Sequence, residues 1–256
     1  MPEDPVSDDV QGYYRRVLPF YEAELADRGD GPFWTWAAGS APGGLVLELG
    51  AGSGRATAFL ARAARRVVAF DLAPEMVAVA RRRLADASNV SLLVADMREA
   101  PLRDRFGLVA AVDDPFVHLT EDEDRRRAFA TAARRLVPEG RFILDMAWFP
   151  PERRRQAESP GGLVMERSGK DELRVRETWR LDPETRIGTA RFEYSRGGEK
   201  IGGAEFPARL WSMEELESRA AEAGLEIARL WGDYDRRPWT RESSERLIAE
   251  MRRLKR

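Results

Sequence analysis

Between residues 45 and 146, short apolar runs alternate with stretches whose apolar residues recur at helical spacing. The apolar runs predict five strands, over residues 45–49, 66–71, 90–95, 107–112 and 140–146. Helical patterns begin between them near Ser53, Pro74 and Thr120. Short strands that are apolar throughout are typical of a parallel sheet buried on both faces. The alternation therefore predicts a doubly wound α/β fold with a mostly parallel sheet.

Two local signals refine these helices. Pro74 stands at a first helical position, where its missing N–H costs nothing. Thr120 and Glu123 have the spacing of a capping box, which predicts a helix that runs to Leu136, before Pro138.

The N-terminal segment has a helical pattern of its own. From Asp8 to Asp27, apolar and aromatic residues recur at helical spacing around Pro19, which predicts a pair of helices broken near that proline. Phe33 opens a further short helix that ends by Gly39. We expect residues 1–40 to form a helical cap.

Residues 163–211 do not continue the alternation of strand and helix patterns. They predict an inserted antiparallel meander of three or four strands. We expect turns at residues 182–185, 197–198 and 202–203, and a bulge within residues 187–194, where the side-chain alternation changes parity. Ser212 and Glu215 then cap a helix that ends at Gly224, and residues 225–231 return to the main sheet. The expected domains are therefore the cap, an α/β domain over 41–160 and 212–256, and an inserted sheet over 161–211.

Composition excludes several kinds of site and partner. The 256 residues contain no cysteine and one histidine, which excludes disulfides and metal sites built on cysteine or several histidines. The net charge is −2 although 34% of residues are charged, so the sequence shows no basic footprint for nucleic acid or an anionic membrane. Since no run approaches the ~20 apolar residues of a membrane span, we expect a cytoplasmic protein.

The strongest candidate site is the glycine-rich turn after the first predicted strand, in Val46–Gly54. A dinucleotide fingerprint requires G-x-G-x-x-G, and its last glycine would fall on Arg55. Glu48 places a carboxylate at the end of the strand, where it would repel a pyrophosphate and suit a cationic ligand. S-adenosylmethionine carries an ammonium and a sulfonium, and no phosphate. Val46–Gly54 thus resembles motif I of the class I S-adenosylmethionine-dependent methyltransferases.

This resemblance implies a seven-stranded sheet with one antiparallel strand. The stretch 246–254 is ambiguous, because its charge suggests a helix whereas the resemblance implies that it is the final antiparallel strand. The resemblance also implies that the N-terminal helices lie over the cofactor. The inserted sheet resembles a lid that would cover the methyl acceptor and supply a contact for a homodimer, and decoration of the sheet edge is the alternative. The predicted cofactor contacts at the glycine-rich turn are Glu48, Leu49, Gly50, Ala51, Gly52 and Gly54.

Further cofactor contacts are expected at the ends of the next strands. Asp71 ends the second strand, where its carboxylate can accept from both ribose hydroxyls. The resemblance assigns Asp96 to the adenine amino group and the backbone N–H of Met97 to a ring nitrogen. Leu72 and Met76 are candidates to pack on the adenosine, with a plain core role as the alternative.

The methyl acceptor is expected beyond the fourth strand. Asp113-Asp114-Pro115-Phe116 partly resembles the motif with which amino methyltransferases grip a planar amine, but Asp114 stands where proline or an apolar residue is expected. The segment is more similar to that of small-molecule methyltransferases, with Asp113 near the methionine end of the cofactor. His118, whose unperturbed pKa is about 6.5, is a candidate general base; a structural histidine is the alternative.

The sequence thus favours methyl transfer from S-adenosylmethionine, with S-adenosylhomocysteine as product, to an amine or hydroxyl of a small molecule. An aminosugar is the more specific interpretation of the acceptor. Two alternatives remain open at this point: a protein that binds the cofactor or its product without catalysis, and a nicotinamide-dependent oxidoreductase, against which Glu48 and Arg55 both argue.

Overall fold

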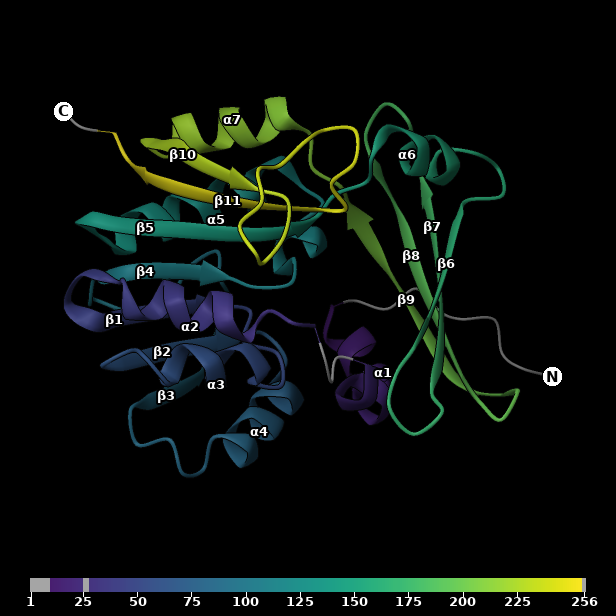
Figure 1. The fold of residues 1–256 in the computed structure, drawn as a ribbon, viewed down its shortest axis with the longest axis horizontal. Coiled ribbons are helices and arrows are strands. Elements are labelled where there is room, and N and C mark those ends of the chain that lie inside the picture. The colour runs from purple at the N-terminus through teal and green to yellow at the C-terminus, as the bar shows by residue number, and fades with distance from the viewer. Residues whose placement is uncertain (1–9, 25–27, 255–256) are drawn as a thin grey trace. The chain divides into compact units, whose positions relative to one another are not determined.

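The computed structural model describes residues 10–24 and 28–254, which divide into two compact units (Figure 1). One unit joins the N-terminal helix to residues 149–210, and the other contains residues 29–148 and 211–254. These boundaries differ from the predicted ones, because the expected cap over residues 1–40 is divided near Gly29. Its first helix lies in the unit of the inserted sheet, and its second in the α/β unit.

Within the described residues, the α/β unit holds a seven-stranded sheet in the order β10-β11-β5-β4-β1-β2-β3, here called the larger sheet. The strands are β1 (Leu45–Leu49), β2 (Arg66–Asp71), β3 (Val90–Val94), β4 (Phe106–Ala111), β5 (Leu136–Ala147), β10 (Leu225–Trp231) and β11 (Arg246–Arg253). Strands β1 to β5 are parallel to one another. The predicted fold class, a mostly parallel doubly wound sheet with an antiparallel insertion, is confirmed.

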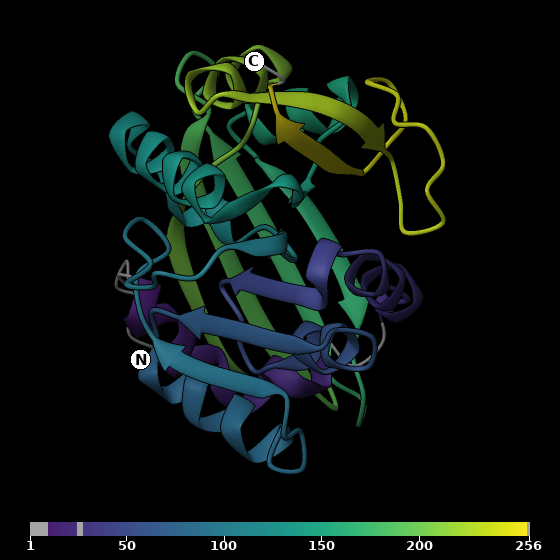
Figure 2. The ribbon, with the colours of Figure 1, turned by 90° about the vertical axis from the view of Figure 1, so that its left-hand side faces the viewer.

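The C-terminal stretch is a strand, as the resemblance implied. Strand β11 lies between β5 and β10 and is antiparallel to both, and Figure 2 shows β10 and β11 running in opposite directions. Its Leu247–Met251 segment is buried, including Glu250, and the other charged residues of this stretch flank that segment. Burial within the sheet outweighs the charge pattern that left the stretch ambiguous.

Helices cover the larger sheet on both faces. The bounds of the elements are α2 (Gly31–Gly39), η1 (Pro42–Gly44), α3 (Arg55–Ala61), α4 (Pro74–Arg83), η2 (Pro115–His118), α5 (Asp122–Arg135) and α7 (Met213–Glu222). One apolar cluster joins α2 and α3 to one face, through residues such as Trp34, Leu60 and Val46. The other joins α5 and α7 to the opposite face, through residues such as Phe129 and Leu216. Successive apolar residues of each parallel strand point to opposite faces of the sheet, so every strand contributes side chains to both cores.

The start of α5 differs from the prediction. The N-cap is Glu121, which has no side-chain capping bond, so the predicted capping box on Thr120 and Glu123 is wrong. Three acidic residues, Asp122, Glu123 and Asp124, fill the first turn, where the positive end of the helix dipole favours carboxylates. At its other end α5 passes directly into β5, with Pro138 in an irregular part of the pairing with β4.

The predicted N-cap of α7, Ser212, is confirmed. Ser212 is the N-cap, and its hydroxyl accepts a hydrogen bond of 3.1 Å from the N–H of Glu215. The helix ends before Gly224, whose φ of +72° is the left-handed conformation typical of a helix end.

The inserted segment forms a four-stranded antiparallel sheet, here called the smaller sheet, within the described residues. Its order is β6 (Leu163–Ser168), β7 (Arg174–Leu181), β8 (Ile187–Arg196) and β9 (Glu199–Arg209), after the short helix α6 (Pro151–Ala157). The meander and its turns at residues 182–185 and 197–198 are as predicted.

Two details of the smaller sheet were predicted wrongly. The pairing of β7 with β8 is continuous, and the irregularity lies instead in β9, where Ile201 is skipped between the pairs Tyr194–Gly202 and Ser195–Lys200. Gly202 and Gly203 are not a turn but part of β9. A Cβ on Gly202 would lie 2.5 Å from the ring of Phe20, so glycine admits this ring against the strand.

Helix α1 (Val10–Glu24) is continuous through Pro19, so the predicted break there is wrong for the described part of the segment. Residues 8, 9 and 25–27 of the predicted pair lie outside the described residues. The helix packs on the smaller sheet on both sides of the proline, with Tyr13 against Phe206 and Phe20 stacked on Tyr194. We attribute the intact helix to these contacts, which offset the roughly 3 kcal/mol cost of an interior proline.

The outward residues of the smaller sheet include partly exposed cross-strand ion pairs, Arg191 with Glu205 and Lys200 with Glu193. Such pairs are typical of a solvated face. The expected lid role and the expected homodimer stay predictions.

Candidate cofactor site

The predicted site residues meet at one edge of the larger sheet. Glu48 and Leu49 end β1, Asp71 ends β2, Asp96 and Met97 follow β3, and Asp113 and His118 follow β4. These four strands are neighbours in the order β4-β1-β2-β3, and all four are parallel. The chain order reverses beside β1, which is where doubly wound sheets bind ligands.

The glycine loop, Gly50–Gly54, joins β1 to α3. Gly50, Gly52 and Gly54 have φ values of +77°, +53° and +79°, which side chains rarely tolerate. The loop also requires space: a Cβ on Gly50 would lie 2.6 Å from Cβ of Pro115, and one on Gly54 would lie 2.9 Å from Leu84. The three glycines are therefore needed for the shape of the loop, as the sequence predicted.

The backbone N–H groups of this loop bond within the protein. Those of Gly50 and Ala51 donate to the carbonyl of Phe70, that of Gly52 to the Asp71 carboxylate, and that of Gly54 to the carbonyl of Ala51. A loop that cradles phosphate instead points such N–H groups at the ligand. The hydrogen bonding of the glycine loop therefore does not match a pyrophosphate site.

The side chain of Asp71 holds the glycine loop by a hydrogen bond. Its Oδ2 accepts from the N–H of Gly52 at 2.8 Å, and its Oδ1 from the N–H of Ala73 at 2.9 Å. Burial raises the pKa of this carboxyl, while the backbone hydrogen bonds oppose the shift. A third backbone hydrogen bond comes from Leu72. A carboxylate has about four acceptor sites, so Asp71 keeps capacity for a ribose hydroxyl.

Glu48 is completely buried. Its Oε2 accepts a 2.6 Å hydrogen bond from the Thr57 hydroxyl, and its Oε1 has no hydrogen-bond partner among the described residues. Burial raises the pKa of Glu48 to about 8, although the Thr57 hydrogen bond opposes the shift. The carboxyl is thus protonated at neutral pH unless a cation approaches it. This modifies the sequence argument, because repulsion of a pyrophosphate requires the charged form.

Asp30 and Arg55 lie beside the glycine loop and were not predicted as site residues. Asp30 is 1% exposed, and its Oδ1 lies 2.5 Å from a guanidinium nitrogen of Arg55. Its Oδ2 is buried and has no hydrogen-bond partner in the described part of the chain. The positive charge of Arg55, the first residue of α3, is therefore neutralised by Asp30. Arg55 thus adds no net positive charge to the acidic site.

The carboxylate of Asp96 is held by its neighbour Arg98. The Arg98 side chain binds both oxygens, at 2.5 Å for the closest pair, and the Arg98 N–H donates to Oδ1 at 2.8 Å. Arg98 also pairs with Asp124 of α5 at 2.8 Å. Partial burial raises the pKa of Asp96, but the Arg98 hydrogen bonds outweigh it and hold the pKa below its usual value. Asp96 is therefore a charged acceptor with a fixed orientation.

The apolar candidates differ in burial. Met76, on α4, is fully buried, as its alternative core role requires, whereas Leu72 is partly exposed just after β2. Met97 is partly exposed, and its side chain lies near Gly50.

After β4, Asp113 and Asp114 form an unusual turn, here called the acidic turn. Both have φ values near +60°, at +61° and +59°. Asp114 is 7% exposed, and burial raises its pKa to about 7. Its Oδ2 accepts from the N–H of Ala147 at 3.1 Å. The turn leads into the short helix η2, which ends at His118.

His118 is partly buried, and its burial lowers the pKa of the imidazole to about 4. The side chain is therefore neutral across the physiological range, which is the form in which an imidazole accepts a proton.

Three residues from the C-terminal half complete this edge of the sheet and were not predicted. Asp145 of β5 is fully buried and binds both Tyr234 and Arg246. The signal for Asp145 was present in the sequence, because it is a carboxylate near the end of an apolar strand, as Glu48 is. Tyr234 and Arg246 carry no comparable signal.

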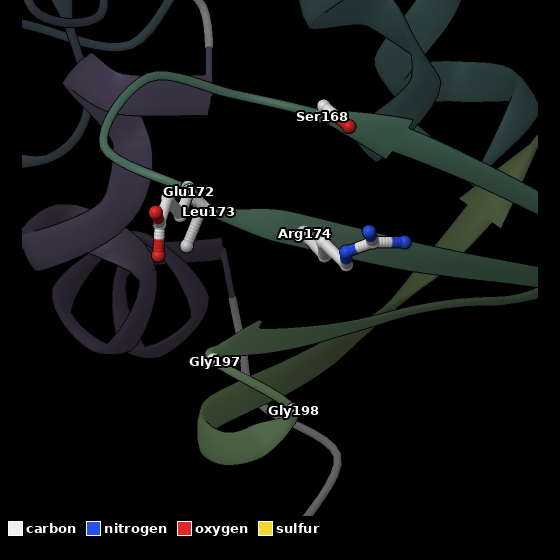
Figure 3. Close-up of a pocket in the computed structure, with 6 residues that line it drawn as sticks. All are labelled: Ser168, Glu172, Leu173, Arg174, Gly197 and Gly198. Carbon is white, nitrogen blue, oxygen red and sulfur yellow. The ribbon is translucent and has the colours of Figure 1, made fainter.

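Other kinds of site receive no support from the described residues. Among them, no cluster of three or more histidine, cysteine or acidic residues could hold a metal ion. No helix in that part of the chain is long and apolar enough to cross a membrane. A cavity of about 380 Å³ lies in the other unit, at the turns of the smaller sheet (Figure 3). Its lining includes Glu172, Arg174 and Gly197 and none of the predicted site residues.

Residues 46–140 match the family described as "Methyltransferase domain". The chain is 27% identical over 217 residues to the cypemycin N-terminal methyltransferase of Streptomyces sp, covering 84% of this chain and 86% of that protein. It is 29% identical over 189 residues to the dTDP-3-amino-3,6-dideoxy-alpha-D-glucopyranose N,N-dimethyltransferase of Streptomyces fradiae, covering 71% and 70% of the two chains.

Among solved structures, the CcbJ methyltransferase from Streptomyces caelestis is similar in fold. The TM-score is 0.82 at 23% sequence identity, over 97% of this chain and 100% of that one. The seven-stranded sheet, the glycine loop with its acidic neighbours and the family match agree with one another. The family match identifies residues 46–140 as a methyltransferase domain, and the similarity in fold to methyltransferases, one of them described as S-adenosylmethionine-dependent, extends over nearly the whole chain.

Proposed function

We propose that this enzyme transfers a methyl group from S-adenosylmethionine to an amine or hydroxyl of a small molecule, and that the residues at the edge of the larger sheet hold the cofactor. The hydrogen bonding of the glycine loop carries this proposal. Four of its N–H groups donate within the protein, and buried carboxyl groups surround it. Such a loop suits a cofactor with positive charge and no phosphate.

The proposed roles follow the order of the strands. Asp71 accepts from the ribose hydroxyls, Asp96 from the adenine amino group, and the N–H of Met97 donates to the adenine ring. Leu72 packs on the adenosine, and the fully buried Met76 supports that side of the site from the core. Glu48 and Asp113 serve the methionine end.

The unpartnered Oε1 of Glu48 and Oδ2 of Asp30 support a cationic group at that end of the site. Buried carboxyl oxygens without hydrogen bonds are costly, and an ammonium offers the donors that they lack.

When bound, S-adenosylmethionine supplies a methyl group that its sulfonium has already activated. The contribution of this chain is then to hold and align the acceptor, since alignment can supply much of the rate of an in-line displacement. We propose that His118 accepts the proton that the acceptor loses. The pKa of about 4 keeps the imidazole unprotonated and available above pH 5, and it also makes the imidazole a weaker base than an ordinary histidine.

The names of the two curated relatives favour nitrogen as the acceptor atom. One is described as an N-terminal methyltransferase and the other as an N,N-dimethyltransferase of an aminosugar nucleotide. We therefore propose an amine acceptor, of the aminosugar type as the specific case.

Calorimetric titration with S-adenosylmethionine, S-adenosylhomocysteine and NADH tests the cofactor assignment. We expect both sulfur compounds to bind and NADH to give no heat of binding. Binding of NADH alone would contradict the proposal. A screen of amines, phenols and carboxylates for S-adenosylhomocysteine release then tests catalysis. Turnover of carboxylates alone would refute the amine or hydroxyl acceptor, and cofactor binding without any turnover would favour a non-catalytic binding protein.

A further inference from the structure

The acidic turn has a backbone conformation that its own residues disfavour. Asp113 and Asp114 are consecutive residues with side chains, and both have left-handed φ values, at +61° and +59°. Aspartate tolerates this conformation singly, but two in succession persist only where the surroundings hold them. The turn is therefore held by its neighbours.

Asp145 is the centre of that support. Its carboxylate is fully buried, and Oδ2 accepts from the N–H of Asp113 at 3.0 Å and from the hydroxyl of Tyr234 at 2.9 Å. Its backbone carbonyl accepts from the N–H of Asp114 at 2.8 Å. One residue of β5 thus binds both N–H groups of the acidic turn.

Arg246 binds the same carboxylate from the other side. Its guanidinium pairs with Oδ1 of Asp145, reaches Oδ1 of Asp113 at 3.3 Å, and lies 5.0 Å from the ring centre of Tyr234. Arg246 is the first residue of β11 and is opposite Ala147 in the sheet. Because β11 is antiparallel, its first residue lies at the end of β5 where the site is.

The acidic turn also touches the glycine loop. Pro115 follows the turn directly, and a Cβ on Gly50 would lie 2.6 Å from Cβ of Pro115 and 3.1 Å from its Cγ. Pro115 therefore lies directly against Gly50, and its position determines how much space is left over that glycine. A continuous set of contacts leads from Asp145 through the turn and Pro115 to the glycine loop.

We propose that Asp145 is a positioning residue for cofactor binding, which acts by holding the acidic turn so that Pro115 covers Gly50. The inference rests on the proposed function, since it assumes that the glycine loop holds the cofactor. Tyr234 and Arg246 orient the Asp145 carboxylate, so a segment before β11 and the start of β11 influence a site built on β1.

The test compares Asp145→Asn with Glu250→Gln. Glu250 of β11 is also fully buried, and it pairs with Arg141 at 3.1 Å, away from the acidic turn. Each substitution removes one carboxylate from a buried ion pair of the same sheet, so each is expected to lower the melting temperature. The binding probe is S-adenosylhomocysteine, with Kd measured by calorimetry. Hydrogen exchange of residues 113–119 reports on the turn itself.

We expect Asp145→Asn to raise Kd about tenfold or more and to speed exchange in residues 113–119, because hydrogen bonds to a charged group are lost. Glu250→Gln is expected to change Kd less than about twofold, since it removes no contact to the turn. Equal Kd values for the two folded variants would overturn the proposal, whatever their melting temperatures.

Tyr234→Phe is the milder second variant, which keeps both charged partners of Arg246. We expect a rise in Kd of several-fold, and an unchanged Kd would overturn the proposal even if Asp145→Asn does not fold. Failure of the proposed function has a different signature, because the unsubstituted protein would then not bind S-adenosylhomocysteine.

Discussion

The N–H of Gly52 lies 2.8 Å from Oδ2 of Asp71, so the carboxylate proposed to hold the ribose also fixes the loop proposed to hold the methionine end. The two residues come from neighbouring strands, since Gly52 follows β1 and Asp71 ends β2. A change at Asp71 therefore acts on the cofactor directly and through the loop.

We expect Asp71→Ala to weaken binding of S-adenosylmethionine by about 1.5–3 kcal/mol, or roughly 10–150-fold in Kd, because hydrogen bonds to a charged acceptor are lost. Calorimetric titration measures this. The control is Asp86→Ala, at an exposed aspartate of the same unit, which is expected to leave Kd unchanged. An unchanged Kd for Asp71→Ala would remove Asp71 from the ribose role.

Gly50→Ala is expected to destabilise the protein more than Gly43→Ala. Both glycines have left-handed φ values, at +77° and +69°, so each substitution introduces backbone strain of about 1 kcal/mol. A Cβ at Gly43 meets nothing within 4 Å, whereas one at Gly50 meets Pro115 at 2.6 Å. Urea unfolding measures the difference between the two variants, which isolates the contact with Pro115. Equal losses of stability would show that the glycine loop and Pro115 move apart to accommodate the new Cβ without a further loss in the free energy of unfolding.

The buried Glu48 predicts a pH dependence of stability. Its pKa is about 8 in the folded protein and near 4.5 in the unfolded chain, so the folded state holds a proton that unfolding releases. The stabilisation from this proton is complete below pH 4.5 and is lost as the pH rises through 8. The slope is at most about 1.4 kcal/mol per pH unit.

Glu48→Gln isolates this effect, because glutamine can keep the hydrogen bond from Thr57 and does not titrate. We expect the free energy of unfolding of the original protein to fall between pH 5 and pH 9 relative to that of the variant. Urea unfolding at several pH values gives the two curves. Parallel curves would mean that Glu48 does not hold a proton in the folded state.

His118→Ala is expected to lower turnover and to leave the Kd of S-adenosylmethionine nearly unchanged. General-base catalysis contributes about 100-fold or more, so the loss in kcat is expected to be of that order. Because the pKa of His118 is about 4, its protonation is expected to impose no fall in kcat between pH 9 and pH 6. Full activity in His118→Ala would end the catalytic role. A fall in kcat below about pH 6.5 in the original protein, absent from the variant, would contradict the low pKa of His118.

Much of the α/β unit was predictable because its signals are local. A buried parallel strand reads as a short apolar run, and β1 and β2 lie within the predicted bounds. The glycine loop was predictable because left-handed backbone and close contact with Pro115 require residues without a side chain. The end of β2 placed Asp71 beside that loop, since neighbouring parallel strands end at one edge.

The errors arose where distant residues outweigh local preference. Pro19 lies inside α1, which Tyr13 and Phe20 anchor on the smaller sheet, and Gly202 lies inside β9 because Phe20 packs against it. The charge on Glu48 could not be predicted from its type, because only the fold shows that the carboxyl is fully buried.

The sequence by itself determined the order of strands and helices, the glycine loop and the acidic residues at the ends of the strands, because each depends on residues close together in the chain. Only the tertiary structure decided that Asp145, Tyr234 and Arg246 meet beneath the acidic turn. Their meeting depends on β11 pairing antiparallel with β5, which brings residues about 100 positions apart into contact. A long-range pairing of this kind leaves no periodic pattern in the sequence.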